Sequence, residues 1–421
     1  MRDKTKKIFV HENWSASEPR FMGTLYADHS KGKETFSFEY EKGWLKSNPF
    51  APILDPDLYL YNGRQFVPID KNMFGIFADS CPDRWGRILM NRREAINARK
   101  EARKPNKLYE SDYLIGVYDE SRLGALRFSL EQNGPYLSND KTMAAPPWAS
   151  LRTLEEASRS FEMDENSLEE KWLNQLIGPG SSLGGARPKA TVQATDGSLW
   201  IAKFPSKHDD IDSGAWEMVA HDLAKLCNID VPDAAVSRFS KQGSTFLVKR
   251  FDRSGSRRIH FASAMTMLGK TDGASAADGT GYLDIASFIR ANGAAPETDL
   301  HELWIRILFS MLISNTDDHL RNHGFLLTES GWRLSPVYDV NPVPYGDTLA
   351  LNVTETDNSI STELLLEVSG YFGLDLKFAK NTVKEMSKLV CENWKKIAER
   401  YSIRRSEIEY MSTAFIYSAI K

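Results

Sequence analysis

The feature that most constrains the fold is an apolar run, L-W-I-R-I-L-F-S-M-L-I from Leu303 to Ile313, that passes directly into polar residues. The run contains Arg306 and is too short to span a bilayer, so it is expected to form a buried helix of a globular core. The segment that follows reads S-N-T-D-D-H-L-R-N-H-G and precedes a short β-like stretch. Polar side chains placed at the end of a rigid buried helix suit a reactive site.

Length and composition bound the class of protein. A chain of 421 residues favours two or three subdomains with a substantial core. Hydrophobic residues make up 41% and ten tryptophans are present, which argues against general disorder. The net charge of -4 gives no global field for nucleic acid, so any DNA contact requires a local patch or a partner.

The cysteine pattern and the N-terminus bear on the compartment. Cys81, Cys227 and Cys391 lie far apart without a CxxC pair, which disfavours a zinc site or disulfide framework and fits a reducing compartment. They are expected to be inert core residues. The basic N-terminus is followed by no long apolar stretch, so we expect a cytoplasmic protein without a secretory signal or membrane anchor.

The order of patterns predicts an α+β chain in three parts. Alternating β-rich segments open a module over residues 1–140, and residues 133–150 form a turn-rich connection. A mixed region over 150–260 is expected to bind nucleotide, and a mainly helical lobe over 261–421 is expected to be catalytic. The helical stretch 83–107 is rich in Arg and Lys, and it is either a solvated face or a surface for a partner or nucleic acid.

The polar segment after the buried helix carries the strongest chemical signal. Asp317 and Asn322 have the D-x-x-x-x-N spacing of a protein-kinase catalytic loop, in which Asp meets the substrate hydroxyl and Asn holds a metal. Arg321 could neutralise the transferred phosphate, and Asp339, after a short apolar strand, is suited to Mg²⁺. The alternative is structural, because Asp and Asn also cap helices and occupy turns, and His319 could be a hydrogen-bonding structural residue.

Upstream residues supply groups that a phosphate needs. Gly180, Gly184 and Gly185 lie in a glycine-rich segment that would let backbone approach phosphates, although an ordinary hairpin turn explains it equally. Lys203 ends a strand and Glu217 lies on the next helix, so the two could form the lysine–glutamate ion pair of kinases. The alternative for Lys203 is a surface lysine.

Together, these segments resemble the HipA family of serine/threonine kinases, which are best known as toxins of bacterial toxin–antitoxin pairs. The resemblance rests on S-L-G-G-A-R-P-K (182–189), I-A-K-F-P (201–205), V-K-R-F-D-R (248–253), T-D-D-H-L-R-N (316–322) and Y-D (338–339), and on the run at 74–87. It implies a protein-kinase-like, two-lobed HipA fold with an N-terminal β-rich subdomain. Arg321 stands in place of the family's usual lysine, and Lys249 stands where Glu is frequent.

The resemblance also implies a complete set of site residues. The catalytic group comprises Asp317, His319, Arg321 and Asn322, with Asn322 and Asp339 as metal ligands. The implied ATP site comprises Ser182, Gly184, Gly185, Ala186, Lys189, Lys203, Glu217, Lys249, Arg250 and Phe251. Ser182, with Ser181 as the alternative, would be the site of autophosphorylation, because a dianionic phosphate in this loop would repel ATP unless the loop moved away.

The resulting expectation is an ATP- and Mg²⁺-dependent serine/threonine protein kinase that acts as a growth-inhibiting toxin. The resemblance implies a HipB-like helix-turn-helix antitoxin as partner, DNA contact only through that antitoxin, and a protein substrate such as an aminoacyl-tRNA synthetase. Two alternatives stay open at this point. The chain could be a small-molecule phosphotransferase, or it could act mainly as a transcriptional corepressor with its antitoxin.

Overall fold

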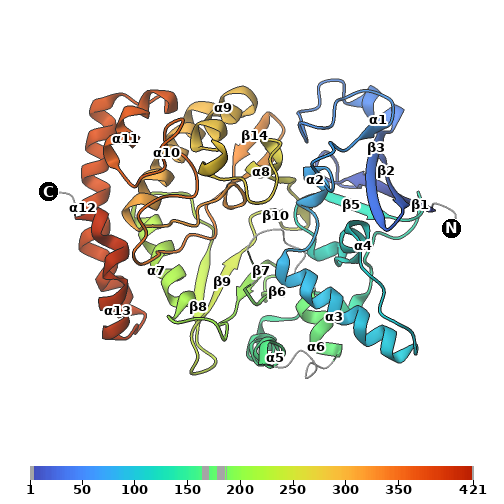
Figure 1. Ribbon diagram of the computed structural model, residues 1–421, viewed down its shortest axis with the longest axis horizontal. Helices are drawn as coiled ribbons and strands as arrows, with labels where there is room; N and C mark the ends of the chain where they lie inside the picture. Colours follow the sequence, from blue (N-terminus) through green and yellow to red (C-terminus); the bar gives the residue numbers. More distant parts are fainter. Residues whose placement is uncertain (1–3, 164–169, 178–184, 186, 420–421) are drawn as a thin grey trace. The chain divides into compact units, whose positions relative to one another are not determined.

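The computed structural model describes residues 4–163, 170–177, 185 and 187–419 (Figure 1). The chain forms two compact units, and each is built from two separate stretches of sequence. Unit 1 comprises Met1–Lys207 and Arg250–Ala262, and unit 2 comprises His208–Lys249 and Ser263–Lys421. The division into three parts that the sequence favours remains a prediction.

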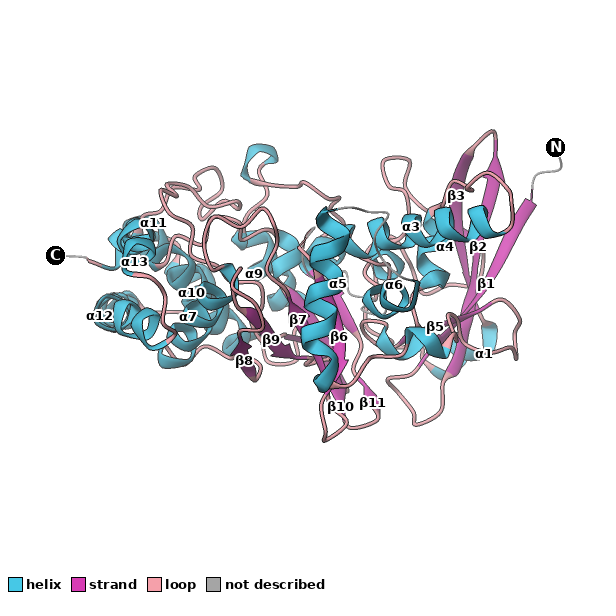
Figure 2. Cartoon of the chain, turned by 90° about the horizontal axis from the view of Figure 1, so that it is seen from below, coloured by secondary structure: helices cyan, strands magenta, loops and turns pink. Residues whose placement is uncertain are grey.

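Unit 1 contains a five-stranded sheet in the order β4-β3-β2-β1-β5. Its strands are β1 (Lys4–Glu12), β2 (Arg20–Ser30), β3 (Lys33–Tyr40), β4 (Gln65–Phe66) and β5 (Leu126–Ser129), and neighbouring strands run antiparallel. The first three strands are long and adjacent, as Figure 2 shows. They bury apolar side chains such as Ile8, Leu25 and Phe38, so the alternating pattern near the N-terminus correctly predicted strands.

Further elements of unit 1 include helices and two hairpins. The helices are α1 (Lys42–Ser47), α2 (Gly75–Ala78), α3 (Arg84–Lys100), α4 (Glu110–Gly116), α5 (Leu151–Met163) and α6 (Glu170–Ile177). Strands β6 (Lys189–Gln193) and β7 (Leu199–Lys203) pair antiparallel, as do β10 (Arg253–Ser254) and β11 (Arg257–Arg258). Helix α6 packs against both α3 and α5.

Unit 2 is mainly helical. Its helices are α7 (Ser213–Leu226), α8 (Ala264–Met267), α9 (Tyr282–Asn292), α10 (Pro296–Leu312), α11 (Thr362–Glu367), α12 (Leu376–Arg400) and α13 (Arg405–Met411). Strands β8 (Ala234–Ser237) and β9 (Thr245–Lys249) form one antiparallel pair, and β13 (Gly324–Thr328) and β14 (Gly331–Leu334) form another. The short strand β12 (Phe261–Ser263) spans the boundary between the units.

The apolar run that dominates the sequence forms the second half of α10. Trp304, Ile307 and Leu308 are fully buried, and Arg306 is accommodated by an ion pair with Glu302, one turn earlier, at 2.8 Å. None of the helices in the described part of the chain is long and apolar enough to cross a membrane.

Two sequence-based expectations concern the burial of the cysteines and the exposure of the basic stretch 83–107. Cys81 and Cys227 are buried, but Cys391 is exposed on α12, so the expectation of three core cysteines was wrong for Cys391. In the basic stretch, Arg99 and Lys100 are exposed, and Arg103 forms ion pairs with Glu94 and Glu101. Part of this stretch therefore faces solvent, and Arg103 is tied to neighbouring acidic residues.

Candidate active site

The polar segment after α10 is held at a rigid position in unit 2. Helix α10 begins with Pro296 and carries Asp299 in its first turn. The Asp299 carboxylate accepts hydrogen bonds from Arg333 and from the backbone N–H of Leu334, which ties β14 to the helix. At the other end, Ser314 has a φ of 50°, a left-handed conformation that turns the chain out of the helix. The polar segment that contains Asp317 therefore begins at the end of a helix that is held in place by β14.

Asp317 and Asn322 lie together, as their spacing suggests. The Asn322 side-chain amide donates to the backbone carbonyl of Asp317 at 2.9 Å, and the backbone N–H of His319 donates to the same oxygen at 3.0 Å. Asp317 is exposed, whereas Asn322 is 5% exposed. The other amide atom of Asn322, Oδ1, is buried and has no hydrogen-bond partner among the described residues.

The neighbouring Asp318 has a different role, which the sequence did not reveal. Its carboxylate is buried, accepts a hydrogen bond from Tyr282 at 2.7 Å and one from Ser310 at 3.2 Å, and lies 3.1 Å from His323 Nε2. Burial alone would raise the pKa of Asp318, but the charge of His323 and these hydrogen bonds outweigh it and lower the pKa. Asp318 thus anchors the loop that presents Asp317.

Asp339 belongs to the same cluster in unit 2. It has a φ of 58°, which is uncommon for a residue other than glycine and is frequent at functional sites. The hydroxyl of the preceding Tyr338 donates to the backbone carbonyl of Arg321 at 2.8 Å, which fastens this segment to the catalytic loop.

The pKa of Asp317 reflects this crowding of carboxylates. Partial desolvation raises the pKa of Asp317, the nearby His319 opposes the rise, and the negative charges of Asp339 and Asp318 add to it. A carboxylate with a raised pKa, exposed beside a second carboxylate, suits a group that meets a substrate proton.

The remaining catalytic candidates also lie on this loop. Arg321 pairs with the exposed Asp272 at 3.2 Å. The Nδ1 atom of His319 is buried without a hydrogen-bond partner in the described part of the chain, so a purely structural hydrogen-bonding role for that atom finds no support.

A divalent metal fits the donors that unit 2 provides. The described residues contain no group of three or more His, Cys, Asp or Glu side chains arranged for a metal. Mg²⁺ needs few protein ligands when a nucleotide supplies phosphate oxygens, and it prefers carboxylate and amide oxygens. Asp339 and the unpartnered Oδ1 of Asn322 are such donors.

The upstream candidates are divided between the two units. Lys189 and Lys203 lie on β6 and β7 of unit 1, and Glu217 lies buried on α7 of unit 2. The ion pair that the sequence suggests between Lys203 and Glu217 would join the units and remains a prediction. Gly180, Ser181, Ser182, Gly184 and Ala186 lie outside the described residues.

Lys189 has partners that local spacing did not suggest. Its ammonium lies 2.5 Å from a carboxylate oxygen of Asp83 and donates to the backbone carbonyl of Gly185 at 3.0 Å. Lys189 is 1% exposed. In this structure, therefore, an acidic residue holds the lysine that the resemblance assigns to ATP.

Three residues of the implied ATP site, Lys249, Arg250 and Phe251, occupy the last position of β9 and the two positions after it. Lys249 pairs with Asp233 at 3.3 Å in unit 2, and Phe251 lies near Phe261, with ring centroids 6.1 Å apart, in unit 1. Arg250 is buried and binds Asp252 at 2.7 Å, so its side chain has a structural role, and only its backbone is suited to contact a nucleotide.

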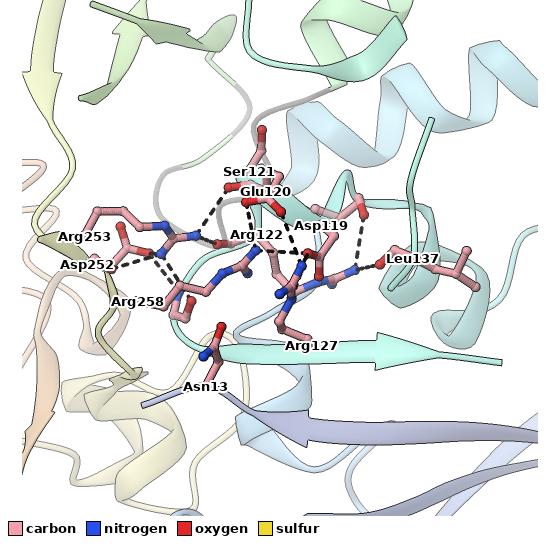
Figure 3. Close-up of polar contacts among 12 residues, drawn as sticks. Asn13, Asp119, Glu120, Ser121, Arg122, Arg127, Leu137, Asp252, Arg253 and Arg258 are labelled. Carbon is pink, nitrogen blue, oxygen red and sulfur yellow. Dashed lines mark hydrogen bonds and ion pairs between the residues drawn. The ribbon is translucent and has the colours of Figure 1, made fainter. Parts of the chain in front are cut away.

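Arg250 is part of a buried ionic cluster in unit 1. Asp252 accepts from Arg250, from Arg253 at 2.6 Å and from the backbone N–H of Gly124 at 2.8 Å. Figure 3 shows Asp252, Arg253 and Arg258 facing the segment that contains Asp119. Arg258 binds Asp119 at 2.9 Å. These contacts fasten the β10–β11 hairpin to the segment before β5.

Comparison with known proteins agrees with this architecture. The HipA-like C-terminal domain family matches residues 181–396, just over half of the chain. Two proteins of Sinorhizobium fredii named "Putative kinase Y4dM" and "Putative kinase Y4mE" are 28% and 29% identical, over 46% and 39% of this chain. The matches cover 51% and 43% of those two proteins, so the chain spans about half the length of the curated relatives it matches.

The fold matches a solved structure over nearly its whole length. This structure is the Shewanella oneidensis toxin–antitoxin complex of HipA, HipB and operator DNA. The match has a TM-score of 0.66 at 17% identity and covers 98% of this chain and 95% of the other. The expected mixed α/β HipA fold is therefore confirmed.

Proposed function

The chain belongs to the HipA-like C-terminal domain family, and we propose that it is an ATP- and Mg²⁺-dependent protein kinase. The observation that carries this proposal is the cluster in unit 2, where Asp317, Asn322 and Asp339 lie on one braced loop system. Asn322 is tied to Asp317, Tyr338 ties the Asp339 segment to Arg321, and the negative charge of Asp339 acts on Asp317.

The chemistry follows from the groups in place. Asp317 would orient the acceptor hydroxyl and take up its proton as the oxygen attacks the γ-phosphorus of ATP, while the bond from that phosphorus to the β–γ bridging oxygen breaks and ADP leaves. Asn322 Oδ1 and Asp339 would hold Mg²⁺, which neutralises phosphate charge when bound. Arg321 is a cation on the same loop and would move from Asp272 toward the transferred phosphoryl group. Asp318, through Tyr282, Ser310 and His323, keeps the loop in position.

The finer assignments belong to the same proposal. The acceptor would be a serine or threonine of a protein, and a translation component such as an aminoacyl-tRNA synthetase is the substrate class that the family resemblance favours. The Shewanella oneidensis HipA structure contains HipB and operator DNA. By analogy, this chain would be a cytoplasmic toxin that a HipB-like helix-turn-helix antitoxin neutralises, with DNA contact through that antitoxin.

The remaining assignments concern the nucleotide and its control. Lys203, Glu217 and the backbone of Lys249, Arg250 and Phe251 would bind ATP. Ser182, or else Ser181, would be autophosphorylated, and Gly184, Gly185 and Ala186 would approach the phosphates.

The experiment that tests this function follows γ-labelled ATP with Mg²⁺ in a bacterial lysate. We expect label in protein, at serine or threonine, in the presence of the intact chain. Label that appears only in small molecules would favour a metabolite phosphotransferase. No transfer at all, together with undiminished repression by the chain and its antitoxin, would favour a corepressor.

A further inference from the structure

Two lysines of unit 1 occupy directly opposite positions on one hairpin. In the antiparallel pair of β6 and β7, Lys189 is the register partner of Lys203, and Ala190 is the partner of Ala202. Opposed residues of an antiparallel pair point to the same face of the sheet, with Cβ atoms about 5 Å apart. Both lysines are largely buried, Lys189 at 1% and Lys203 at 8% exposure. Like charges opposed in this way repel one another unless a negative group lies nearby.

The negative group at Lys189 is Asp83. Its carboxylate lies 2.5 Å from the Lys189 ammonium, and both side chains are only 2% exposed. The other carboxylate oxygen of Asp83 accepts from the backbone N–H of Gly86 at 2.8 Å and so caps the N-terminus of α3. One carboxylate thus neutralises a buried lysine and starts a helix.

A second contact joins the start of α3 to the start of β6. The indole N–H of Trp85, also in the first turn of α3, donates to the backbone carbonyl of Lys189 at 3.1 Å. The Lys189 ammonium in turn donates to the backbone carbonyl of Gly185. The start of α3 therefore holds Lys189 at the start of β6, and Lys189 in turn contacts Gly185.

We propose that Asp83 is a positioning residue that sequesters Lys189 and thereby assigns ATP-phosphate binding to Lys203 alone. This inference rests on the proposed kinase function. It separates two lysines that sequence resemblance places in one ATP site: Lys203 contacts phosphate, whereas Lys189 is held by Asp83 and donates to the backbone carbonyl of Gly185. The contact between Asp83 and Lys189 depends on α3, so residues that precede the family-matched region would contribute to nucleotide binding.

The test compares ATP and adenosine affinities, measured by calorimetry with Mg²⁺, for the full chain and for Lys189→Met, Lys203→Met, Asp83→Asn and the Asp83→Asn/Lys189→Met double variant. The ratio of the two affinities isolates the phosphate contribution. Lys203→Met should lower this ratio about ten-fold, and Lys189→Met should leave it close to that of the parent. Asp83→Asn should raise it, because the Lys189 ammonium then adds an unneutralised positive charge beside Lys203. The double variant should return it to the value of the parent.

Two results would overturn the proposal. One is a loss of phosphate preference in Lys189→Met as large as that in Lys203→Met, which would make Lys189 a direct phosphate ligand. The other is a failure of Lys189→Met to reverse the effect of Asp83→Asn on this ratio.

Urea unfolding of the nucleotide-free variants separates this proposal from the kinase proposal. Asp83→Asn should lower the unfolding midpoint, and adding Lys189→Met should restore part of it, because the uncompensated charge is gone. If the parent chain bound no ATP, the proposed function would fail while this rescue still held. A double variant no more stable than Asp83→Asn would refute the pairing itself.

Discussion

The side-chain amide of Asn322 donates a 2.9 Å hydrogen bond to the backbone carbonyl of Asp317. This bond orients the amide so that Nδ2 is used internally, while Oδ1 is left buried without a partner among the described residues. A buried amide oxygen without a hydrogen-bond partner is able to coordinate a cation. In the proposed function, the same residue would brace the loop that holds Asp317 and would also offer a metal ligand, and the two roles can be separated by experiment.

Asn322→Ala should raise the Mg²⁺ concentration required for half-maximal phosphate transfer and lower kcat, each by about 10- to 100-fold. A Mg²⁺ titration of transfer at saturating ATP measures both effects. Asn393→Ala on α12, where the amide donates to the Leu389 carbonyl one turn earlier, is the matched control and should behave like the parent. An unchanged Mg²⁺ requirement in Asn322→Ala would exclude Asn322 as a metal ligand.

Asp317 and Asp318 are adjacent in sequence, but their substitution should change stability in opposite directions. The raised pKa of Asp317 means that the ionised carboxylate opposes folding once pH rises through that pKa. Asp317→Asn should therefore stabilise the protein at neutral pH. Urea unfolding measures this change, and a less stable variant would contradict the pKa direction.

Asp318→Asn should destabilise the protein by about 1–3 kcal/mol at neutral pH, because the buried charge that pairs with His323 is lost. The lowered pKa of Asp318 means that its contribution is present above the ordinary carboxyl pKa of about 3.9 and is lost as pH falls through the lowered value. Unfolding curves at decreasing pH should therefore show the deficit shrinking. A deficit independent of pH would argue against an ionised Asp318.

The ionic cluster of unit 1 gives a prediction about stability alone. Asp252→Ala would leave the buried guanidinium groups of Arg250 and Arg253 without their carboxylate, which should cost about 3–5 kcal/mol. Glu120→Ala is the matched control, since the Glu120 side chain is 64% exposed and its ion pairs should contribute about 0–1 kcal/mol. Equal urea midpoints for the two variants would show that Asp252 is dispensable.

Autophosphorylation has a direct readout in intact mass. Incubation with ATP and Mg²⁺ should add phosphate to the parent chain, and Ser182→Ala should remove most of it. Ser181→Ala is the control and should keep the added mass. The reverse pattern would move the site to Ser181, and retention of phosphate in both variants would place it elsewhere in the chain.

Local sequence patterns predicted the elements whose interactions are local. The apolar run became the buried half of α10, and the D-x-x-x-x-N spacing became a real contact, because the four intervening residues bring Asn322 back to the Asp317 carbonyl. The three N-terminal strands followed from alternation, since a sheet with one buried face imposes that period.

Contacts between distant residues were not predictable in this way. Asp83 and Lys189 are 106 positions apart, and nothing in either segment shows that they meet. The burial of Asp318 was not predictable either, because its hydrogen bonds from Tyr282 and Ser310 depend on the packing of α9 and α10. The same holds for Arg250, whose partners lie partly in the segment that contains Ser121 and Arg122.

A single-turnover measurement of γ-phosphate transfer in Asp317→Asn, with ATP affinity measured on the same preparation, tests the proposed catalytic centre most directly. An asparagine keeps the shape of the side chain and removes its ability to accept a proton. Transfer should fall by about 10²- to 10⁴-fold while ATP binds within a few-fold of the parent. Transfer at a rate near that of the parent, with ATP binding intact, would contradict the assignment of Asp317 and with it the proposed catalytic centre.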